Sequence, residues 1–298
     1  MLKNLAFALF LFASGAAFAD APAAASMTAE QFESSLTFQQ GKISLPGNIA
    51  TLNLPPSFRY LSPTDTERVL VEAWNNPPGT KSLGMIVPTG VSLLSPEGWA
   101  VVVTYDADGH VKDDDADSIK YDELLKEMQE GTEASNEERK KLGFPSMSMV
   151  GWAEKPSYDK ASHKLYWAQE LKTAGATGNG LNYNIRVLGR EGVLVLNAVA
   201  GMDQIAKIKT EMKQVTAFSE FTSGNKYTDF NSSTDKTAEY GIAAMVAGGV
   251  AAKLGLFGKL FAFLLLFKKL VIGGVVMLGI FLSKLFGKKD DGKVNLEK

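Results

Sequence analysis

The chain has 298 residues, of which 45% are hydrophobic and 21% are charged, and its formal net charge is -2. This length and composition exclude a largely disordered chain and leave room for one domain core and a separate membrane segment. The absence of cysteine excludes disulfides, thiol nucleophiles, zinc sites with cysteine ligands, iron–sulfur clusters and a lipid-bearing signal-peptide cysteine.

The N-terminus has the pattern of a secretory signal peptide. Lys3 precedes an apolar run over residues 5–13, and small residues follow up to Ala19. This order of charged, apolar and small residues is typical of export signals. We therefore expect residues 1–19 to be removed, and residues 20–40 to form a tether whose polar second half is helical.

Charged residues are distributed unevenly along the chain. Acidic side chains outnumber basic ones between residues 20 and 239, whereas lysines predominate from residue 240 onward. An acidic domain is poorly suited to nucleic acid, because neutralising phosphates requires clustered lysine and arginine. We expect no nucleic-acid partner.

The exported domain is predicted to begin with a hairpin and a helix. Residues 42–45 and 49–54 alternate apolar and polar side chains around a Pro-Gly-Asn turn, which predicts two paired strands. The pattern at 62–75 predicts a helix, with Ser62 as N-cap and Pro63 at the first helical position.

The sequence of the rest of the domain predicts a sheet and two more helices. Period-two patterns predict strands at residues 82–87, 99–105, 146–153, 163–171, 181–188 and 192–199, and turn residues lie at 155–157, 175–180 and 189–192. Apolar residues at helical spacing predict helices over 121–142 and 203–218. Because the last four strands follow one another through short turns, we expect an α+β fold with a mostly antiparallel sheet and packed helices, over residues 41–235.

One loop of the domain is strongly acidic. If Gly109 is the turn glycine of a calcium loop, Asp106 and Asp108 fall at the third and fifth positions and Asp115 at the twelfth. The first position is Thr104, and a strand precedes the loop where an EF-hand has a helix. We prefer a β-turn that leads into the next helix, with the three aspartates kept as a candidate metal site.

The remaining candidate residues form no known catalytic motif. His110 and His163 lie in different segments, and we expect both to be exposed. The four tryptophans could line a pocket, although large aromatic residues on strands more often fill a core. Arg186 and Arg190 could bind an anion, but pairing with local acids is the preferred interpretation. We identify no catalytic residue and expect no cofactor.

The apolar stretch over residues 241–286 predicts a membrane segment. Lys268 and Lys269 interrupt it and should lie at a membrane interface, since adjacent lysines at the bilayer centre are costly. Lys284 is expected at the cytoplasmic interface, and residues 287–298 form a basic polar tail. Two topologies fit: a helical hairpin that turns at the lysine pair, or one transmembrane helix with a second helix on the membrane surface.

Small residues recur every four positions in the first part of this stretch. Ala244, Gly248 and Ala252 share one face of the expected helix, which permits close helix packing in lipid. We expect them to contact the second membrane segment or another copy of the chain.

Six short motifs resemble a known family. They are Leu54–Leu61, Trp74–Pro78, Leu83–Ile86, Val150–Ala153, Lys164–Ala168 and Leu181–Arg190. Together they are similar to a bacterial family of predicted membrane-anchored proteins of unknown function, from about residue 41 to residue 285. This resemblance implies a location and an architecture but no activity. The order of the late elements also resembles the sandwich folds of the photosystem P subunit and Mog1 type, which concerns the fold alone.

These observations predict a membrane-anchored protein of the bacterial cell envelope. The anchor would lie in the inner membrane, with a binding or interaction domain in the periplasm or otherwise outside the cytoplasm. Its expected partners are the membrane and either an envelope protein or a second copy. The alternative is an envelope enzyme such as a metal-dependent hydrolase, which would need convergent histidine and carboxylate ligands that the chain does not present in sequence.

Overall fold

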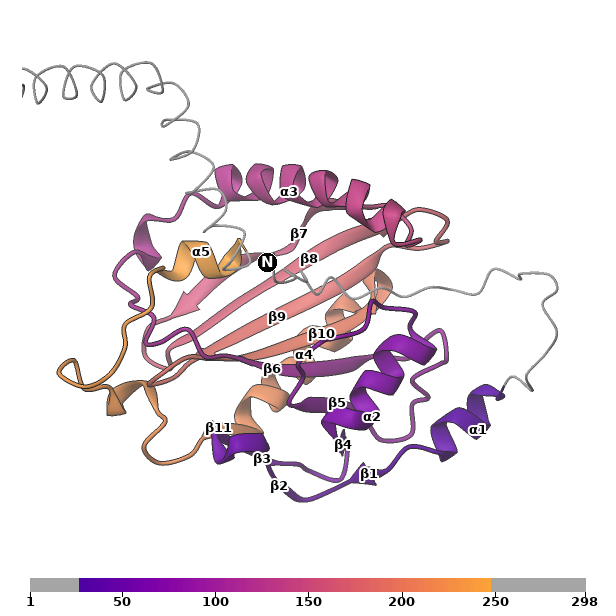
Figure 1. The fold of residues 1–298 in the computed structure, drawn as a ribbon, viewed down its shortest axis with the longest axis horizontal. Helices are drawn as coiled ribbons and strands as arrows, with labels where there is room; N and C mark the ends of the chain where they lie inside the picture. The colour runs from indigo at the N-terminus through magenta and orange to yellow at the C-terminus, as the bar shows by residue number, and fades with distance from the viewer. Residues whose placement is uncertain (1–26, 248–298) are drawn as a thin grey trace, which may run out of the picture. The chain divides into compact units, whose positions relative to one another are not determined.

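An eight-stranded antiparallel sheet dominates the fold (Figure 1). The computed structural model describes residues 27–247. The strand order is β1-β4-β5-β6-β10-β9-β8-β7. The strands are β1 (Phe38–Gln39), β4 (Phe58–Leu61), β5 (Gly84–Pro88), β6 (Ala100–Asp106), β7 (Met147–Asp159), β8 (Lys164–Thr173), β9 (Gly180–Leu188) and β10 (Val193–Gly201). The prediction of an α+β fold with a mostly antiparallel sheet is confirmed.

The last four strands of this sheet form the predicted meander, in which each strand pairs with the next. β10 then pairs with β6, where Asn197 lies opposite Val102, and this joins the meander to the N-terminal strands. The turn predicted at residues 155–157 is wrong, because these residues lie inside β7. Register shifts make bulges there, and the edge position of β7 accommodates Pro156, whose missing N–H breaks no central ladder.

A second sheet has three short strands in the order β11-β3-β2. They are β2 (Lys42–Ser44), β3 (Ala50–Asn53) and β11 (Ser219–Phe221). The predicted hairpin is confirmed, and its turn is the 3-10 element η1 (Pro46–Asn48), in which Gly47 has a φ of 75°. β1, β4 and β11 were not predicted, because strands of two to four residues carry little pattern of their own and these three lack a turn like the Pro-Gly-Asn turn that marks the hairpin of β2 and β3.

Five α-helices occur in the described part of the chain. They are α1 (Ala29–Ser34), α2 (Pro63–Arg68), α3 (Tyr121–Lys141), α4 (Ile205–Phe218) and α5 (Ile242–Val246), with the π-helical turn η2 (Val69–Ala73) and the 3-10 turns η3 (Ala116–Ser118), η4 (Met202–Gln204) and η5 (Tyr227–Asp229). The start of α2 is as predicted, since the Ser62 hydroxyl accepts a hydrogen bond from the Asp65 amide at 3.2 Å. α3 and α4 lie within the two other predicted helical ranges.

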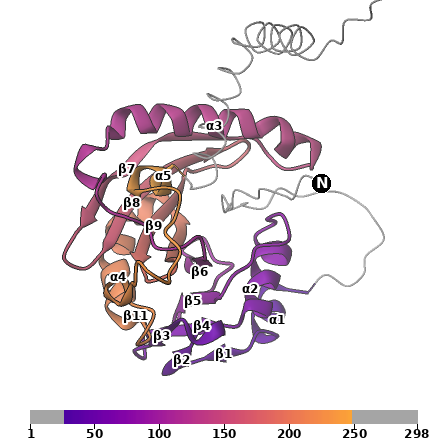
Figure 2. The ribbon, with the colours of Figure 1, turned by 60° about the vertical axis from the view of Figure 1, so that its left-hand side comes forward.

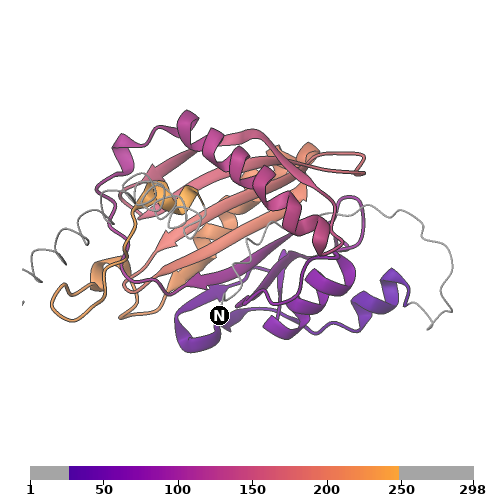
Figure 3. The ribbon, with the colours of Figure 1, turned by 45° about the horizontal axis from the view of Figure 1, so that its top comes forward.

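Both faces of the large sheet are covered (Figures 2 and 3). On one face, α4 and the small sheet enclose a core that includes Ile208 and Met212. On the other face, α3 and α5 cover the meander half through residues such as Met128. Helices α1 and α2 cover the half that contains β4, β5 and β6. Two apolar clusters therefore share this second face.

α5 belongs to the folded domain. Ile242, Met245 and Val246 are buried in the same cluster as α3 and the meander. The domain therefore extends past the boundary at residue 235 that the sequence suggested, and the first residues of the apolar stretch serve its core. Within residues 27–247, no helix is long and apolar enough to cross a membrane. The rest of the expected membrane segment lies outside the described residues.

Candidate functional site

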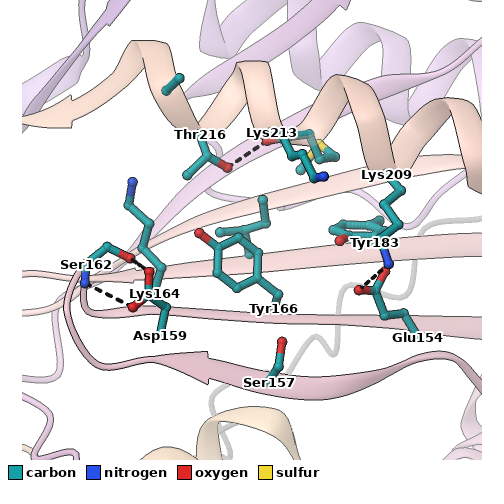
Figure 4. Close-up of a pocket in the computed structure, with 13 residues that line it drawn as sticks. Glu154, Ser157, Asp159, Ser162, Lys164, Tyr166, Tyr183, Lys209, Lys213 and Thr216 are labelled. Atoms are coloured by element: carbon teal, nitrogen blue, oxygen red, sulfur yellow. Dashed lines mark hydrogen bonds and ion pairs between the residues drawn. The ribbon is translucent and has the colours of Figure 1, made fainter.

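A pocket of about 500 Å³ opens between α4 and strands β7, β8 and β9 (Figure 4). Its lining combines aromatic, basic and hydroxyl side chains. The lining residues are Glu154, Ser157, Asp159, Ser162, Lys164, Tyr166, Tyr183, Ile185, Lys209, Met212, Lys213, Thr216 and Ala217. The pocket is of the size that small-molecule sites have in other proteins.

Alternation along two neighbouring strands builds the floor of the pocket. Tyr166 on β8 pairs in register with Ile185 on β9, so both side chains face α4. Tyr183 lies two residues before Ile185 and faces the same way, and Met212 packs on them from the helix. Burial raises the pKa of Tyr166 and Tyr183, so both phenols stay neutral and offer hydroxyl groups.

An ion pair occupies one end of the pocket. Lys209 donates to Glu154 at 2.9 Å, which joins α4 to β7. At the other end, Asp159 accepts hydrogen bonds from the Ser162 hydroxyl at 2.6 Å and the Ala161 amide at 3.0 Å. These hydrogen bonds lower the pKa of Asp159. Figure 4 shows Tyr166 between the two ends.

Two lysines in the pocket form no ion pair within residues 27–247. Lys164 rises from β8 toward α4, and Lys213 comes from the helix one turn after Lys209 (Figure 4). Burial lowers the pKa of Lys164, while Asp159 and Glu220 oppose that shift. A desolvated ammonium group without an ion-pair partner gains from a bound anion. The pocket therefore combines two free cations with an uncharged aromatic floor.

Two of the three aspartates of the acidic loop are used in other contacts. Asp108 accepts a hydrogen bond from the Tyr240 hydroxyl at 2.8 Å. Asp115 accepts from the amides of Ile242 at 2.9 Å and Ala243 at 3.2 Å, at the start of α5. Asp106 is exposed at the end of β6. In the part of the chain that the structure describes, no group of three or more histidine, cysteine or acidic side chains could hold a metal ion.

The expectation that both histidines are exposed is wrong. His110 is 6% exposed, and the rings of Phe230 and Tyr227 stack on it at centroid distances of 3.8 and 4.2 Å. His163 is half-buried and stacks on Tyr227 at 4.0 Å. Asp113 accepts hydrogen bonds from the hydroxyls of Tyr158 at 2.8 Å and Tyr227 at 3.4 Å. We call the group of His110, His163, Tyr227 and Phe230 the aromatic stack.

The structure also places the four tryptophans and the two arginines that the sequence suggested for a pocket or an anion site. Trp74, Trp99 and Trp167 are core residues, Trp152 is partly buried, and none of them lines the pocket. Arg190 binds Asp235 through two hydrogen bonds of 2.7 and 2.8 Å, as expected for pairing with a local acid. Arg186 forms no such pair among the described residues.

The predicted helix-packing and membrane-interface residues fall mostly outside the described part. Ala244 is half-buried in α5. Gly248 and Ala252, with Lys268, Lys269 and Lys284, are beyond residue 247, so their assignments stay predictions.

The residues of the pocket were missed at the sequence level. Lys164 and Tyr166 alternate on one strand, and Lys209 and Lys213 lie four residues apart beside the apolar stripe of a helix. Either pattern alone is typical of a solvated surface. Only the packing of α4 on the meander brings them together.

The family model for a protein of unknown function, DUF2167, matches residues 37–279. No curated relative matches the chain. The solution structure of cyanobacterial PsbP (CyanoP) from Synechocystis is similar with a TM-score of 0.35 and 8% identity, over 68% of this chain and 98% of that one. The crystal structure of the Ran-binding protein Mog1p from Saccharomyces cerevisiae is similar with a TM-score of 0.31 and 10% identity, over 66% and 100%.

Proposed function

This chain belongs to the DUF2167 family of proteins of unknown function, and we propose that it is a binding protein whose pocket between α4 and the meander holds a small organic anion. The observation that carries the proposal is the pair Lys164 and Lys213, two cations without ion-pair partners among the described residues, above a tyrosine floor. The pocket is thus a site for recognition.

The charges of the pocket favour an anion. Glu154 is neutralised by Lys209, and the oxygens of Asp159 are occupied by Ser162 and Ala161. Asp159 keeps its negative charge, so the three lysines of the lining exceed its two acids by one positive charge, which is left for a ligand. A carboxylate or phosphate would accept charge-assisted hydrogen bonds from these ammonium groups. It would also restore the solvation that Lys164 loses by burial.

The floor of the pocket favours a ligand with a flat apolar body. Tyr166, Ile185 and Met212 present rings and carbon atoms, Ser157 adds a hydroxyl to the lining, and the Thr216 hydroxyl donates to the Met212 carbonyl at 2.6 Å. Aromatic floors with a few polar groups at the rim are the usual construction of small-molecule sites. The ligand class is therefore an aromatic or similarly planar molecule with one anionic group.

The proposed location is the cell envelope. The N-terminal pattern of residues 1–19 supports export, and the apolar residues beyond 249 are numerous enough for a membrane anchor. In this proposal the chain is held in the bacterial inner membrane, with the binding domain on the far side from the cytoplasm. The pocket would then sample small anions there.

Calorimetric titration of the full-length chain in detergent tests the pocket. Phenyl phosphate is the probe, because it joins an anion to a flat ring. We expect saturable binding that the double variant Lys164→Met, Lys213→Met weakens at least tenfold, since each charge-assisted hydrogen bond is worth about 1.5–3 kcal/mol. Phenol and inorganic phosphate, which each carry one half of the probe, should bind more weakly.

The matched control is the double variant Lys172→Met, Lys207→Met. These lysines lie on the same two elements, β8 and α4, but outside the pocket. The control should bind phenyl phosphate as the unaltered chain does. Equal losses in both double variants, or no saturable binding at all, would refute the assignment of the pocket.

A further inference from the structure

A band of amide side chains crosses the face of the large sheet opposite to the pocket. It consists of Gln169 on β8, Asn182 and Asn184 on β9, and Asn197 on β10. Asn197 is paired in register with Asn184, and Asn182 with Gln169, so all four side chains lie on one face. Their exposed fractions are only 3–8%. We call these four residues the amide band.

The amide band separates the two apolar clusters of this face. Val195 and Leu165 on one side belong to the cluster under α3 and α5, and Val102 and Val199 on the other belong to the cluster beside α2. A central position in a sheet between two cores is where apolar side chains are expected. Four adjacent amides at that position call for a physical reason.

The hydrogen bonds within residues 27–247 do not supply that reason. Asn184 donates to the Asn182 carbonyl at 3.2 Å and accepts from Arg186 at 3.3 Å. The Asn197 Oδ1 atom is buried without a partner, and the side chains of Gln169 and Asn182 form no hydrogen bond among the described residues. Buried polar groups in native proteins are normally paired, and unpaired ones cost free energy. This band is therefore incomplete.

Two further side chains extend the band at one end. The Trp167 ring is paired with Asn184 across the strands, and its Nε1–H is also buried without a partner. Arg186 lies over the Trp167 ring at 4.9 Å and is half-buried. Burial lowers the pKa of Arg186 to about 10. A positive charge and an unused N–H donor thus adjoin the unpaired amides.

We propose that the amide band is a second binding site, which takes an extended peptide that carries a carboxylate for Arg186. Primary amides present one donor and one acceptor side by side, and this matches the N–H and C=O of a peptide backbone. The guanidinium of Arg186 is the group best shaped to bind a carboxylate through two hydrogen bonds. The peptide would thereby satisfy the orphaned atoms of Asn197 and Trp167.

The geometry favours a peptide over a sugar. Sugars commonly stack on a free aromatic face, whereas Arg186 lies over the ring of Trp167 at 4.9 Å. A nucleotide is disfavoured because Arg186 is the single cation of the band. The band spans three neighbouring strands, a width of about 10 Å, which corresponds to roughly three residues of extended chain.

Fluorescence anisotropy with the full-length chain in detergent tests the second site. The probe is fluorescein-labelled Ala-Ala-Ala with a free C-terminal carboxylate, compared with the same peptide amidated. We expect saturable binding of the free peptide and at least tenfold weaker binding of the amidated one. The variant Arg186→Gln should bind both peptides with the weaker affinity. The absence of saturable peptide binding, or saturable binding of diacetylchitobiose in its place, would overturn the proposal.

A stability measurement separates a binding role from a structural one. Asn197→Leu replaces an unpaired amide by an apolar group of similar shape, so we expect it to abolish peptide binding and to raise the melting temperature. The control Asn136→Leu alters a buried asparagine whose amide is fully bonded to Met147, and it should lower the melting temperature while peptide binding persists. A lower melting temperature or loss of folding in Asn197→Leu would show that the amide is structural.

Discussion

Packing around the side chain of His110 favours one protonation state of its imidazole ring. Burial is the largest effect on its pKa and lowers it, although the backbone at Gly189 and Arg190 and the charge of Asp113 act in the opposite direction. The rings of Tyr227 and Phe230 stack on the imidazole. The folded chain therefore favours neutral His110.

Neutral His110 makes stability depend on pH. A histidine whose pKa is lowered in the folded state binds fewer protons there than in the unfolded state. Its contribution to the free energy of unfolding is therefore fully present above the ordinary histidine pKa of about 6.5, and it is lost as the pH falls below that value. We expect the free energy of unfolding to decrease between pH 7.5 and 5.5, by up to about 1.4 kcal/mol per unit below 6.5. Urea titrations at several pH values measure this slope.

The variant His110→Phe isolates the effect. A phenyl ring can keep the stacking with Tyr227 and Phe230 but cannot bind a proton, so the slope should flatten. His163→Asn serves as the comparison, because it removes the other histidine and keeps His110; its backbone φ of 52° suits asparagine. An unchanged slope in His110→Phe would assign the pH dependence to other groups.

At the scale of elements, the predictions succeeded where a segment carries its own pattern. The meander, α3 and α4 each have a clear period, and turn residues or a capping residue mark their ends. β11 was missed because its three residues are a strand only through pairing with β3, which lies far away in the chain. The extension of β7 through Pro156 was missed for the opposite reason, since local turn chemistry is overridden by pairing with β8.

The candidate sites could not be predicted from the sequence either, because their residues come together only through contacts between distant elements. The pocket combines Lys164 and Tyr166 from a strand with Lys213 from a helix, and no local pattern connects them. The aromatic stack joins His110 and His163 through Tyr227, a residue that had no motif to single it out. A sequence states which residues can do chemistry, but their convergence depends on packing between distant elements.

The contact between α3 and β7 allows a prediction at this scale. The Asn136 side chain donates to the Met147 carbonyl and accepts from the Met147 amide, both at 2.8 Å. Asn136→Ala would leave both buried backbone groups unpaired, so we expect a loss of about 2–4 kcal/mol in the free energy of unfolding. Denaturant unfolding followed by circular dichroism measures the loss.

Gly131 provides a control on the same helix. It is exposed in the interior of α3, and an added Cβ would meet nothing within 4 Å. Gly131→Ala should therefore stabilise the chain by about 0.5–1 kcal/mol, through helix propensity alone. If Asn136→Ala changes the free energy of unfolding by no more than Gly131→Ala does, the two hydrogen bonds of Asn136 do not hold the helix to the sheet.

At the scale of the molecule, the segment after β11 is bound back onto the domain at several points. Arg190 binds Asp235 through its two hydrogen bonds, and the ring of His110 packs against Tyr227 and Phe230. Asp115 then accepts from the first amides of α5. The chain up to residue 247 is thus bound to the core, and α5 is its last described element.

Two shortened chains test this arrangement. A chain of residues 20–247 keeps α5, whereas a chain of residues 20–240 loses Ile242, Met245 and Val246 from the core. Full burial of such a side chain is worth about 1.5–3 kcal/mol, so the shorter chain should melt at a clearly lower temperature. In our proposal the full-length chain stays in the membrane pellet after a carbonate wash, and the 20–247 chain is released in folded form. Equal melting temperatures for the two shortened chains would mean that α5 adds nothing to the domain, and a full-length chain in the wash would refute the anchor.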